Sequence, residues 1–261
     1  MGVVNVTPDS FSDGGANVDP AIAVQTARRL LAEGAALVDV GGESTRPGAD
    51  AVSLDEELRR VLPVLEGLVG LPVSIDTSKA EVARRALELG ATLVNDVTAL
   101  RAEPALAGVI ADAGAYVCLM HMQGEPRTMQ AAPRYADVVG EVAAFLEDRL
   151  AAAVAAGIAE DHVCLDPGFG FGKRPDQNLA LIRGLDRICR LGRPVLVGVS
   201  RKSTLARVLG DPDGRSAGTA ASIGAAVAAF DRGAALFRAH DVAPHVEALA
   251  VAAAIERGRV A

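Results

Sequence analysis

Short apolar segments alternate with longer helical segments eight times along this 261-residue chain, and no other feature limits its fold as much. The apolar segments are rich in Val, Leu and Ile throughout, as expected of parallel strands that are covered on both faces. The helical segments are rich in Ala, Leu, Arg and Glu, and most of them end at a glycine shortly before the next strand. Eight strand–helix units in about 260 residues are typical of a (β/α)8 barrel, whereas a doubly wound sheet usually has about five to seven strands.

We therefore predict an α/β protein with a single domain, residues 1–261, folded as a (β/α)8 TIM barrel. The strands are expected at residues 2–6, 36–40, 72–75, 92–94, 115–120, 162–165, 194–199 and 235–238. The helices are expected at residues 20–32, 54–68, 80–89, 104–111, 136–156, 178–190, 217–231 and 242–257.

Polar residues lie at the carboxyl ends of the expected strands, whereas the residues that begin the strands are uncharged and offer no candidate functional group, except for His162. In a barrel all carboxyl ends face one rim, so these polar groups converge on a single cleft. The asymmetry predicts an active site there. The polar residues are Asn5, Asp39 with Glu43, Asp76, Asn95 with Asp96, His121, Asp166, Ser200 to Lys202, and Arg238 with His240.

The charge of the chain limits its partners. A net charge of −7 argues against general binding to nucleic acids or to anionic membranes. No apolar run reaches 18 residues and the first residues carry no basic segment, so we expect a soluble, cytoplasmic protein. Lys79, Lys173 and Lys202 are the three lysines among 26 basic residues. Either chance kept them, or each occupies a place that needs a compact ammonium group rather than a guanidinium.

Two candidate sites can also be interpreted as ordinary structural features. The loop at residues 5–15 is long, polar and ends in glycines, so we expect a mobile lid. In this loop, Asn5 and Asp13 carry hard oxygen atoms that suit a Mg²⁺ ion held partly by a substrate's phosphates. A turn-rich loop with helix caps would have the same sequence features. Asp76 is either a helix N-cap or a carboxylate that stabilises positive charge on a substrate.

The sixth loop, residues 166–173, has a glycine at every second position, which lets the backbone approach a ligand, and the phenylalanines between them offer flat surfaces. After the seventh strand, Lys202 and the amides at a helix start form a candidate anion site. Together with Arg238 and His240 at the end of strand eight, it predicts binding of a phosphate ester or a diphosphate.

These motifs together resemble the dihydropteroate synthase family, in order and with similar spacing over nearly the whole chain. The family consists of TIM barrels that join 6-hydroxymethyl-7,8-dihydropterin diphosphate to p-aminobenzoate and release diphosphate. The segments that carry the resemblance are residues 5–15, 41–48, 76–79, 95–96, 118–124, 166–173, 200–203 and 238–242.

The resemblance implies a role for each candidate residue. Asp76, Lys202 and Asp13 are implied as catalytic, and Asn5 and Asp13 as Mg²⁺ ligands. The implied pterin-binding residues are Asp76, Asn95, Asp166, Lys202 and Arg238. The implied diphosphate-binding residues are Asn5, Arg238 and His240. The implied p-aminobenzoate-binding residues are Phe11, Thr45, Arg46, Pro47, Phe171 and Ser203.

The resemblance also implies a homodimer and competition by sulfonamides for the p-aminobenzoate pocket. Two other functions stay open. A pterin-dependent methyltransferase would share the barrel and the pterin-binding residues, but it needs neither a diphosphate site nor the pocket of Phe171 and Ser203. A catalytically silent pterin-binding paralogue would keep the motifs without the activity.

Overall fold

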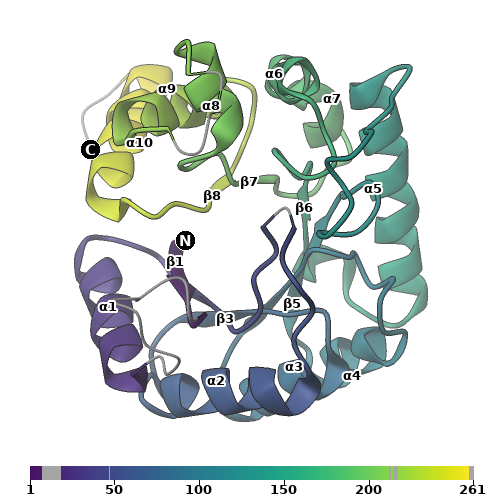
Figure 1. Ribbon diagram of the computed structural model, residues 1–261, viewed down its shortest axis with the longest axis vertical. Helices are drawn as coiled ribbons and strands as arrows, with labels where there is room; N and C mark the ends of the chain where they lie inside the picture. The colour runs from purple at the N-terminus through teal and green to yellow at the C-terminus, as the bar shows by residue number, and fades with distance from the viewer. Residues whose placement is uncertain (8–18, 47, 212, 214–216, 259–261) are drawn as a thin grey trace.

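The computed structural model describes residues 1–7, 19–46, 48–211, 213 and 217–258. Phe11, Asp13 and Pro47, and with them most of the predicted lid, lie outside the described residues. Eight strands in the described part alternate with helices that surround them (Figure 1). The strands are β1 (Gly2–Asn5), β2 (Val38–Gly41), β3 (Val73–Asp76), β4 (Leu93–Asp96), β5 (Tyr116–Met120), β6 (Val163–Asp166), β7 (Leu196–Val197) and β8 (Leu236–Phe237). The helices are α1 (Pro20–Ala32), α2 (Leu54–Glu66), α3 (Ala80–Glu88), α4 (Ala105–Ala113), α5 (Val138–Ala155), η2 (Glu160–His162), α6 (Pro175–Arg183), α7 (Leu185–Cys189), α8 (Ser203–Val208), α9 (Thr219–Phe230) and α10 (Val242–Arg257).

The strands are parallel and follow the order of the sequence. Strands β1 to β6 form one sheet in consecutive order, and β7 pairs with β8. Two isolated parallel bridges join the two sheets, from Leu165 to Val195 at one seam and from Gly2 to Ala239 at the other. The strand order therefore runs from β1 to β8 and returns to β1, and the predicted (β/α)8 barrel is confirmed.

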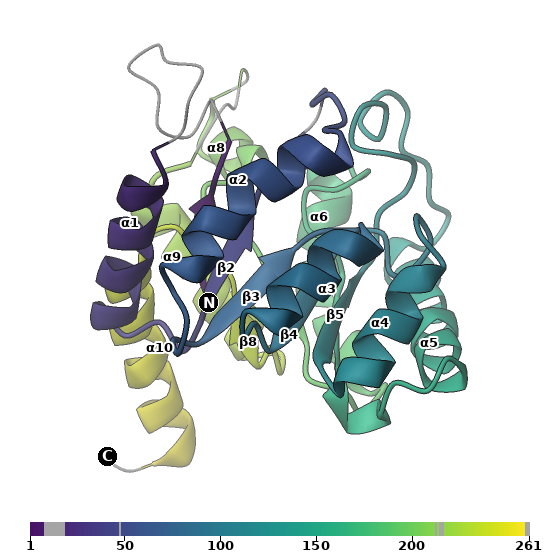
Figure 2. The same ribbon diagram turned by 90° about the horizontal axis from the view of Figure 1, so that it is seen from below.

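Local sequence explains where several helices begin. Asp19 caps α1 by accepting a hydrogen bond from the Ala21 amide, and Pro20 occupies the first helical position. Ser53 and Asp137 cap α2 and α5 in the same way. Figure 2 shows these helices packed along the outside of the sheet. No helix in the described residues combines the length and the hydropathy needed to cross a bilayer.

The inside of the barrel changes character along the strands. The main apolar core lies between strands and helices, and a second, smaller apolar cluster occupies the barrel interior. Two residues beyond Leu93 and Cys164 of that cluster, on the same inner face, come the buried Asn95 and Asp166. The carboxyl ends of the strands thus bring polar side chains into the barrel. The buried residues of the inner cluster are Leu93, Cys118, Cys164 and Leu196.

The structure corrects several predicted boundaries. The helix expected at residues 178–190 is divided at Gly184 into α6 and α7, and a separate helix α8 precedes α9. Strands β7 and β8 are only two residues long, because their flanks contribute single bridges rather than continuous pairing. His162 closes the short helix η2 instead of beginning β6.

Candidate active site

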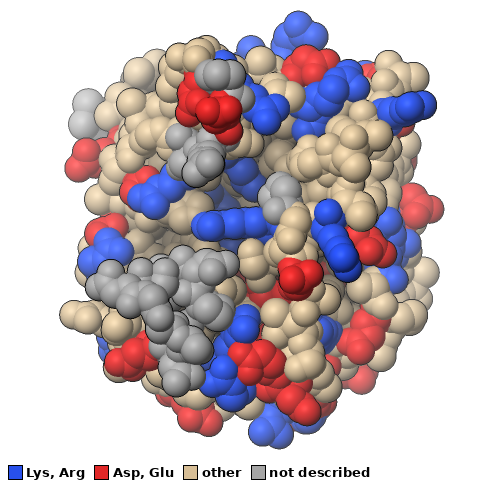
Figure 3. Space-filling view, viewed as in Figure 1, with Lys and Arg blue, Asp and Glu red and all other residues tan. Residues whose placement is uncertain are grey.

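A cavity of about 1160 Å³ opens at the carboxyl ends of the strands, and every described residue to which the family resemblance gives a role lines it, whereas Asp39, Asp96 and His121 do not. These residues come from seven of the eight strand–loop units, as expected for a barrel rim. In Figure 3 basic side chains gather around the hollow in this face of the molecule. The predicted residues that line the cavity are Asn5, Thr45, Arg46, Asp76, Asn95, Asp166, Phe171, Lys202, Ser203, Arg238 and His240.

Arg238 is the centre of a buried polar network. Its Nε donates to Asp39 over 2.6 Å, and its other donor group, Nη2, binds Asp76 over 3.0 Å. Asp39 also accepts hydrogen bonds from Ser74 (2.5 Å) and from the amide of Asn95 (3.1 Å). Asp39 is completely buried and orients two predicted pterin-binding residues at once.

The role of Asp39 was missed in the sequence, although the signal was present. Asp39 interrupts the apolar run Ala-Leu-Val-Asp-Val, and a carboxylate within a buried strand requires a charged or hydrogen-bonding partner. Its partner Arg238 lies 199 residues further along the chain, so the sequence could not identify it. Asp96, which the sequence predicts in the cleft, instead binds Thr98 and the Leu100 amide and so shapes the loop after β4.

Asp76 is no helix cap. Lys79 occupies the N-cap position of α3, and Asp76 points to Arg238 at the end of β3. Lys79 binds Glu43 and the buried Glu57, and thereby ties the loop after β2 to helix α2. A compact ammonium shared between two carboxylates agrees with the second reading of the rare lysines.

Burial shifts the pKa values of the ionisable side chains that line the cavity. It raises the pKa of Asp166 to about 6. Burial, assisted by the charge of Arg238, lowers the pKa of Lys202 to about 8. The pKa of Asp76 is raised by burial and by the neighbouring Asp39 carboxylate, against the opposing effect of Arg238. An anionic ligand would reduce the electrostatic repulsion between Lys202 and Arg238. A ligand that carries positive charge would favour the ionised form of Asp76.

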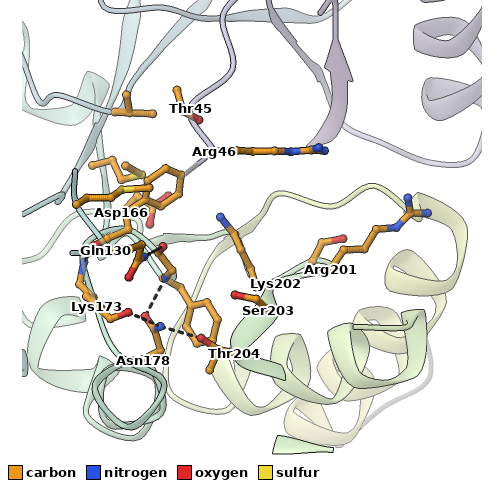
Figure 4. Close-up of a pocket in the computed structure, with 18 of the residues that line it drawn as sticks. Thr45, Arg46, Gln130, Asp166, Lys173, Asn178, Arg201, Lys202, Ser203 and Thr204 are labelled. Atoms are coloured by element: carbon orange, nitrogen blue, oxygen red, sulfur yellow. Dashed lines mark hydrogen bonds between the residues drawn. The ribbon is translucent and has the colours of Figure 1, made fainter. Parts of the chain in front are cut away.

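His240 and Arg46 lie beside this network. Burial and the charges of Arg238, Arg201 and Lys202 lower the pKa of His240 to about 4. The His240 Nδ1 and backbone amide both lie near the Ser200 hydroxyl, at 3.0 and 3.1 Å. Arg46 makes no ion pair with any described residue and lies across the pocket from Lys202 (Figure 4). The site therefore offers free positive charge to an anion.

The loop after β6 is fixed by buried contacts. Lys173 donates from Nζ to the carbonyl oxygens of Gly168 and Phe171, each over 2.9 Å, and lies 2.9 Å from His121 Nδ1. Burial lowers the pKa of Lys173 to about 7. Phe169 packs into the main core and also lines the cavity, whereas the centre of the Phe171 ring lies 4.2 Å from the Lys202 ammonium.

Gly168 has no room for a side chain. Its φ is +67°, and a Cβ there would overlap the carbonyl oxygen of His121. We expect Gly168→Ala to lower the free energy of unfolding by about 2–5 kcal/mol through backbone strain and overpacking. Gly192→Ala is the matched control, because Gly192 has a φ of +78° but open space around it, and should cost only about 1–2 kcal/mol. Urea denaturation measures both; equal losses would contradict the steric argument.

The described residues alone do not complete a metal site. They hold no group of three or more His, Cys, Asp or Glu side chains able to bind a metal ion. The Asn5 side chain lines the cavity and makes no hydrogen bond to any described residue, so its amide oxygen is available. One hard oxygen fits a Mg²⁺ ion whose other ligands come from water and from a substrate's phosphates.

Comparisons with known proteins agree on one family. Residues 1–240 match the sequence profile of the family described as pterin binding enzyme. The dihydropteroate synthase of Escherichia coli (strain K12) is 46% identical over 255 residues, which cover 96% of this chain and 89% of that protein. The solved dihydropteroate synthase of Xanthomonas albilineans with 4-aminobenzoic acid is 50% identical with a TM-score of 0.89, covering 98% of this chain and 92% of the other. The Yersinia pestis dihydropteroate synthase, solved in a complex with a sulfonamide drug, is 45% identical with a TM-score of 0.91, covering 98% of this chain and 94% of the other.

Proposed function

Since the chain belongs to the dihydropteroate synthase family of pterin-binding enzymes, we propose that this one cavity binds both substrates of dihydropteroate synthesis. The activity joins 6-hydroxymethyl-7,8-dihydropterin diphosphate to p-aminobenzoate. The observation that carries the assignment of roles is the buried network in which Arg238 binds Asp76, beside Lys202 and His240. Residues 1–261 act in this proposal as one domain.

The pterin ring binds deep in the barrel, among the polar groups that extend from the strand ends. Asp76, Asn95 and Asp166 supply hydrogen-bonding groups for its edge, and Lys202 and Arg238 supply donors. Three of these side chains are almost fully buried, which excludes water from competing for the ring. Asp39 holds Asn95 and Arg238 in place through the hydrogen bonds described above.

The diphosphate lies toward the rim, where Arg238 and His240 bind it. As the bond from the pterin methylene to the diphosphate oxygen breaks, the Arg238 guanidinium neutralises the negative charge that leaves, and His240 offers a hydrogen bond to it. Positive charge develops on the methylene and the conjugated ring. Asp76 stabilises it, because the buried carboxylate is held at a raised pKa and gains most from a nearby cation.

The p-aminobenzoate amine attacks the methylene as a neutral nucleophile, forms the new carbon–nitrogen bond and releases a proton. It needs no strong general base. Thr45, Arg46, Phe171 and Ser203 surround the substrate in this proposal, with Arg46 as the partner of its carboxylate. Sulfonamides compete there, which is supported by the Yersinia pestis structure in complex with such a drug. Phe11, Asp13 and Pro47 keep their proposed roles from the resemblance.

Mg²⁺ is the proposed cofactor, and it would supply positive charge at the diphosphate when bound, with Asn5 and Asp13 as its protein ligands. We expect synthesis to be lost with excess chelator, and Asn5→Ala to lower it at least tenfold at limiting Mg²⁺. Calorimetry gives a second readout: Mg²⁺ should strengthen diphosphate binding to the original protein and no longer do so in Asn5→Ala. Equal activity with and without chelator would refute the metal role.

Two further proposals concern the surroundings of the enzyme. A homodimer formed by the last helices is supported by exposed apolar side chains on α10, namely Val246, Val251 and Ile255. A cytoplasmic location is the proposal for the protein in the cell. The methyltransferase alternative is disfavoured by the cluster of Arg238, His240 and Lys202, for which a methyl donor has no use.

A further inference from the structure

We propose that Asn178, in the first turns of α6, is a positioning residue that fixes the spacing between the two walls of the p-aminobenzoate pocket. The inference rests on the proposed function, in which Phe171 forms one wall and Ser203 the other. Asn178 lies outside every segment that carries the family resemblance. Its side chain is 1% exposed and lines the cavity from below the loop after β6.

One amide group connects both walls. Asn178 Oδ1 accepts a hydrogen bond of 2.8 Å from the Gly170 amide, and Nδ2 donates to the Thr204 hydroxyl over 2.9 Å (Figure 4). Gly170 immediately precedes Phe171, and Thr204 immediately follows Ser203. The distance from Phe171 to Ser203 is therefore set through one planar side chain.

An amide suits this place because it combines an acceptor and a donor in a rigid unit. Gly170 has a φ of +87°, and its amide finds its partner in Asn178. Thr204 is 3% exposed, so its hydroxyl also needs a partner within the protein. The backbone amide of Asn178 donates to Arg174 as part of helix α6, which gives the connection a firm base.

Of the proposed pterin-binding groups, Asp76 and Asn95 do not depend on this connection, whereas Lys202 lies beside Ser203 and over the Phe171 ring. Asp76 and Asn95 are held by Arg238 and Asp39, and within the described part of the chain the Asn178 side chain makes no hydrogen bond to their strands. Loss of the amide should therefore loosen the pocket for p-aminobenzoate more than the pterin site, where Asp76 and Asn95 keep their contacts. Substitution of a residue with a merely structural role would weaken the binding of both substrates to the same extent.

The experiment uses Asn178→Ala and Thr204→Val, the second of which removes one hydroxyl and keeps the shape of the side chain. We expect the KM for p-aminobenzoate to rise about tenfold in each, as for the loss of one buried hydrogen bond of about 1.4 kcal/mol. The kcat at saturation should stay within about twofold, and the affinity for the pterin diphosphate should fall clearly less than the affinity for p-aminobenzoate. The double variant should be no worse than Asn178→Ala, because both changes break the same connection.

Gln177→Ala is the matched control. Gln177 is a buried amide in the same turn of α6, but it caps only the Arg174 amide of its own helix. It should lower the melting temperature while the KM for p-aminobenzoate stays unchanged. An unchanged KM in Thr204→Val, or an equal loss of pterin affinity, would overturn the positioning role, and Thr204→Val decides the matter if Asn178→Ala does not fold.

Phe171→Ala and Ser203→Ala separate this inference from the proposed function. If both raise the KM for p-aminobenzoate while Asn178→Ala and Thr204→Val do not, only the positioning role is wrong. If neither raises it, the pocket itself is misassigned and the inference falls with it.

Discussion

Asp76→Asn should reduce dihydropteroate synthesis by about 100- to 1000-fold, the usual effect of removing one group that stabilises transition-state charge. The same change should stabilise the free protein at alkaline pH. Burial and Asp39 raise the pKa of Asp76, so the folded protein holds this proton more tightly than the unfolded chain does. Unfolding therefore releases this proton, so the free energy of unfolding falls as the pH rises. An asparagine has no proton to release and no such pH dependence.

Thermal unfolding at pH 5 and pH 8 measures the second effect. The melting temperature of Asp76→Asn should exceed that of the original protein more at pH 8 than at pH 5. Asp112→Asn is the control, because Asp112 is exposed on α4 and should shift neither value. A pH-independent difference would mean that the carboxyl of Asp76 ionises without cost.

Arg238→Ala should lower the free energy of unfolding by about 3–5 kcal/mol at pH 8, because it leaves two buried carboxylates without their cation. The loss should shrink at pH 5, where the Asp76 carboxyl, with its raised pKa, takes up a proton. Urea denaturation at both pH values provides the test.

The double variant Arg238→Ala, Asp39→Asn separates stability from function. It should recover part of the lost stability, since one buried charge is gone, but diphosphate affinity should remain as low as in Arg238→Ala. Recovery of diphosphate binding in the double variant would show that Arg238 only neutralises Asp39.

The fold could be predicted because its pattern is local. Each strand is a short run of Val, Leu and Ile, and each helix has its own caps or glycine stop, so the eight units could be counted without knowledge of their contacts. The boundaries that failed depend on tertiary contacts. Gly184 breaks a helix that its periodicity would continue, and the flanks of β7 pair only through single bridges.

The site could be predicted only in part, for a similar reason. Residues at strand ends were found because barrel geometry brings all strand ends to one rim. The contacts that hold them were not found: the importance of Asp39 depends on Arg238, and that of Asn178 on Gly170 and Thr204. Such pairings join separate elements, and nothing in one chain segment announces them.

Backbone pairing is uneven around the barrel, so the part formed by β7 and β8 should open more easily than the part formed by β1 to β6. Asp76, Asn95 and Asp166 extend from a continuous six-stranded sheet, whereas Arg238 and His240 follow β8, a two-residue strand joined to β1 at a single bridge. Local opening begins where backbone pairing is sparse, so amide exchange should be faster around β7 and β8 than in β2 to β5. In the proposed function, the diphosphate would contact this less stable part of the ring, while Asp76, Asn95 and Asp166 would hold the pterin from the more stable part. We therefore expect release of diphosphate to require local opening only around β7 and β8.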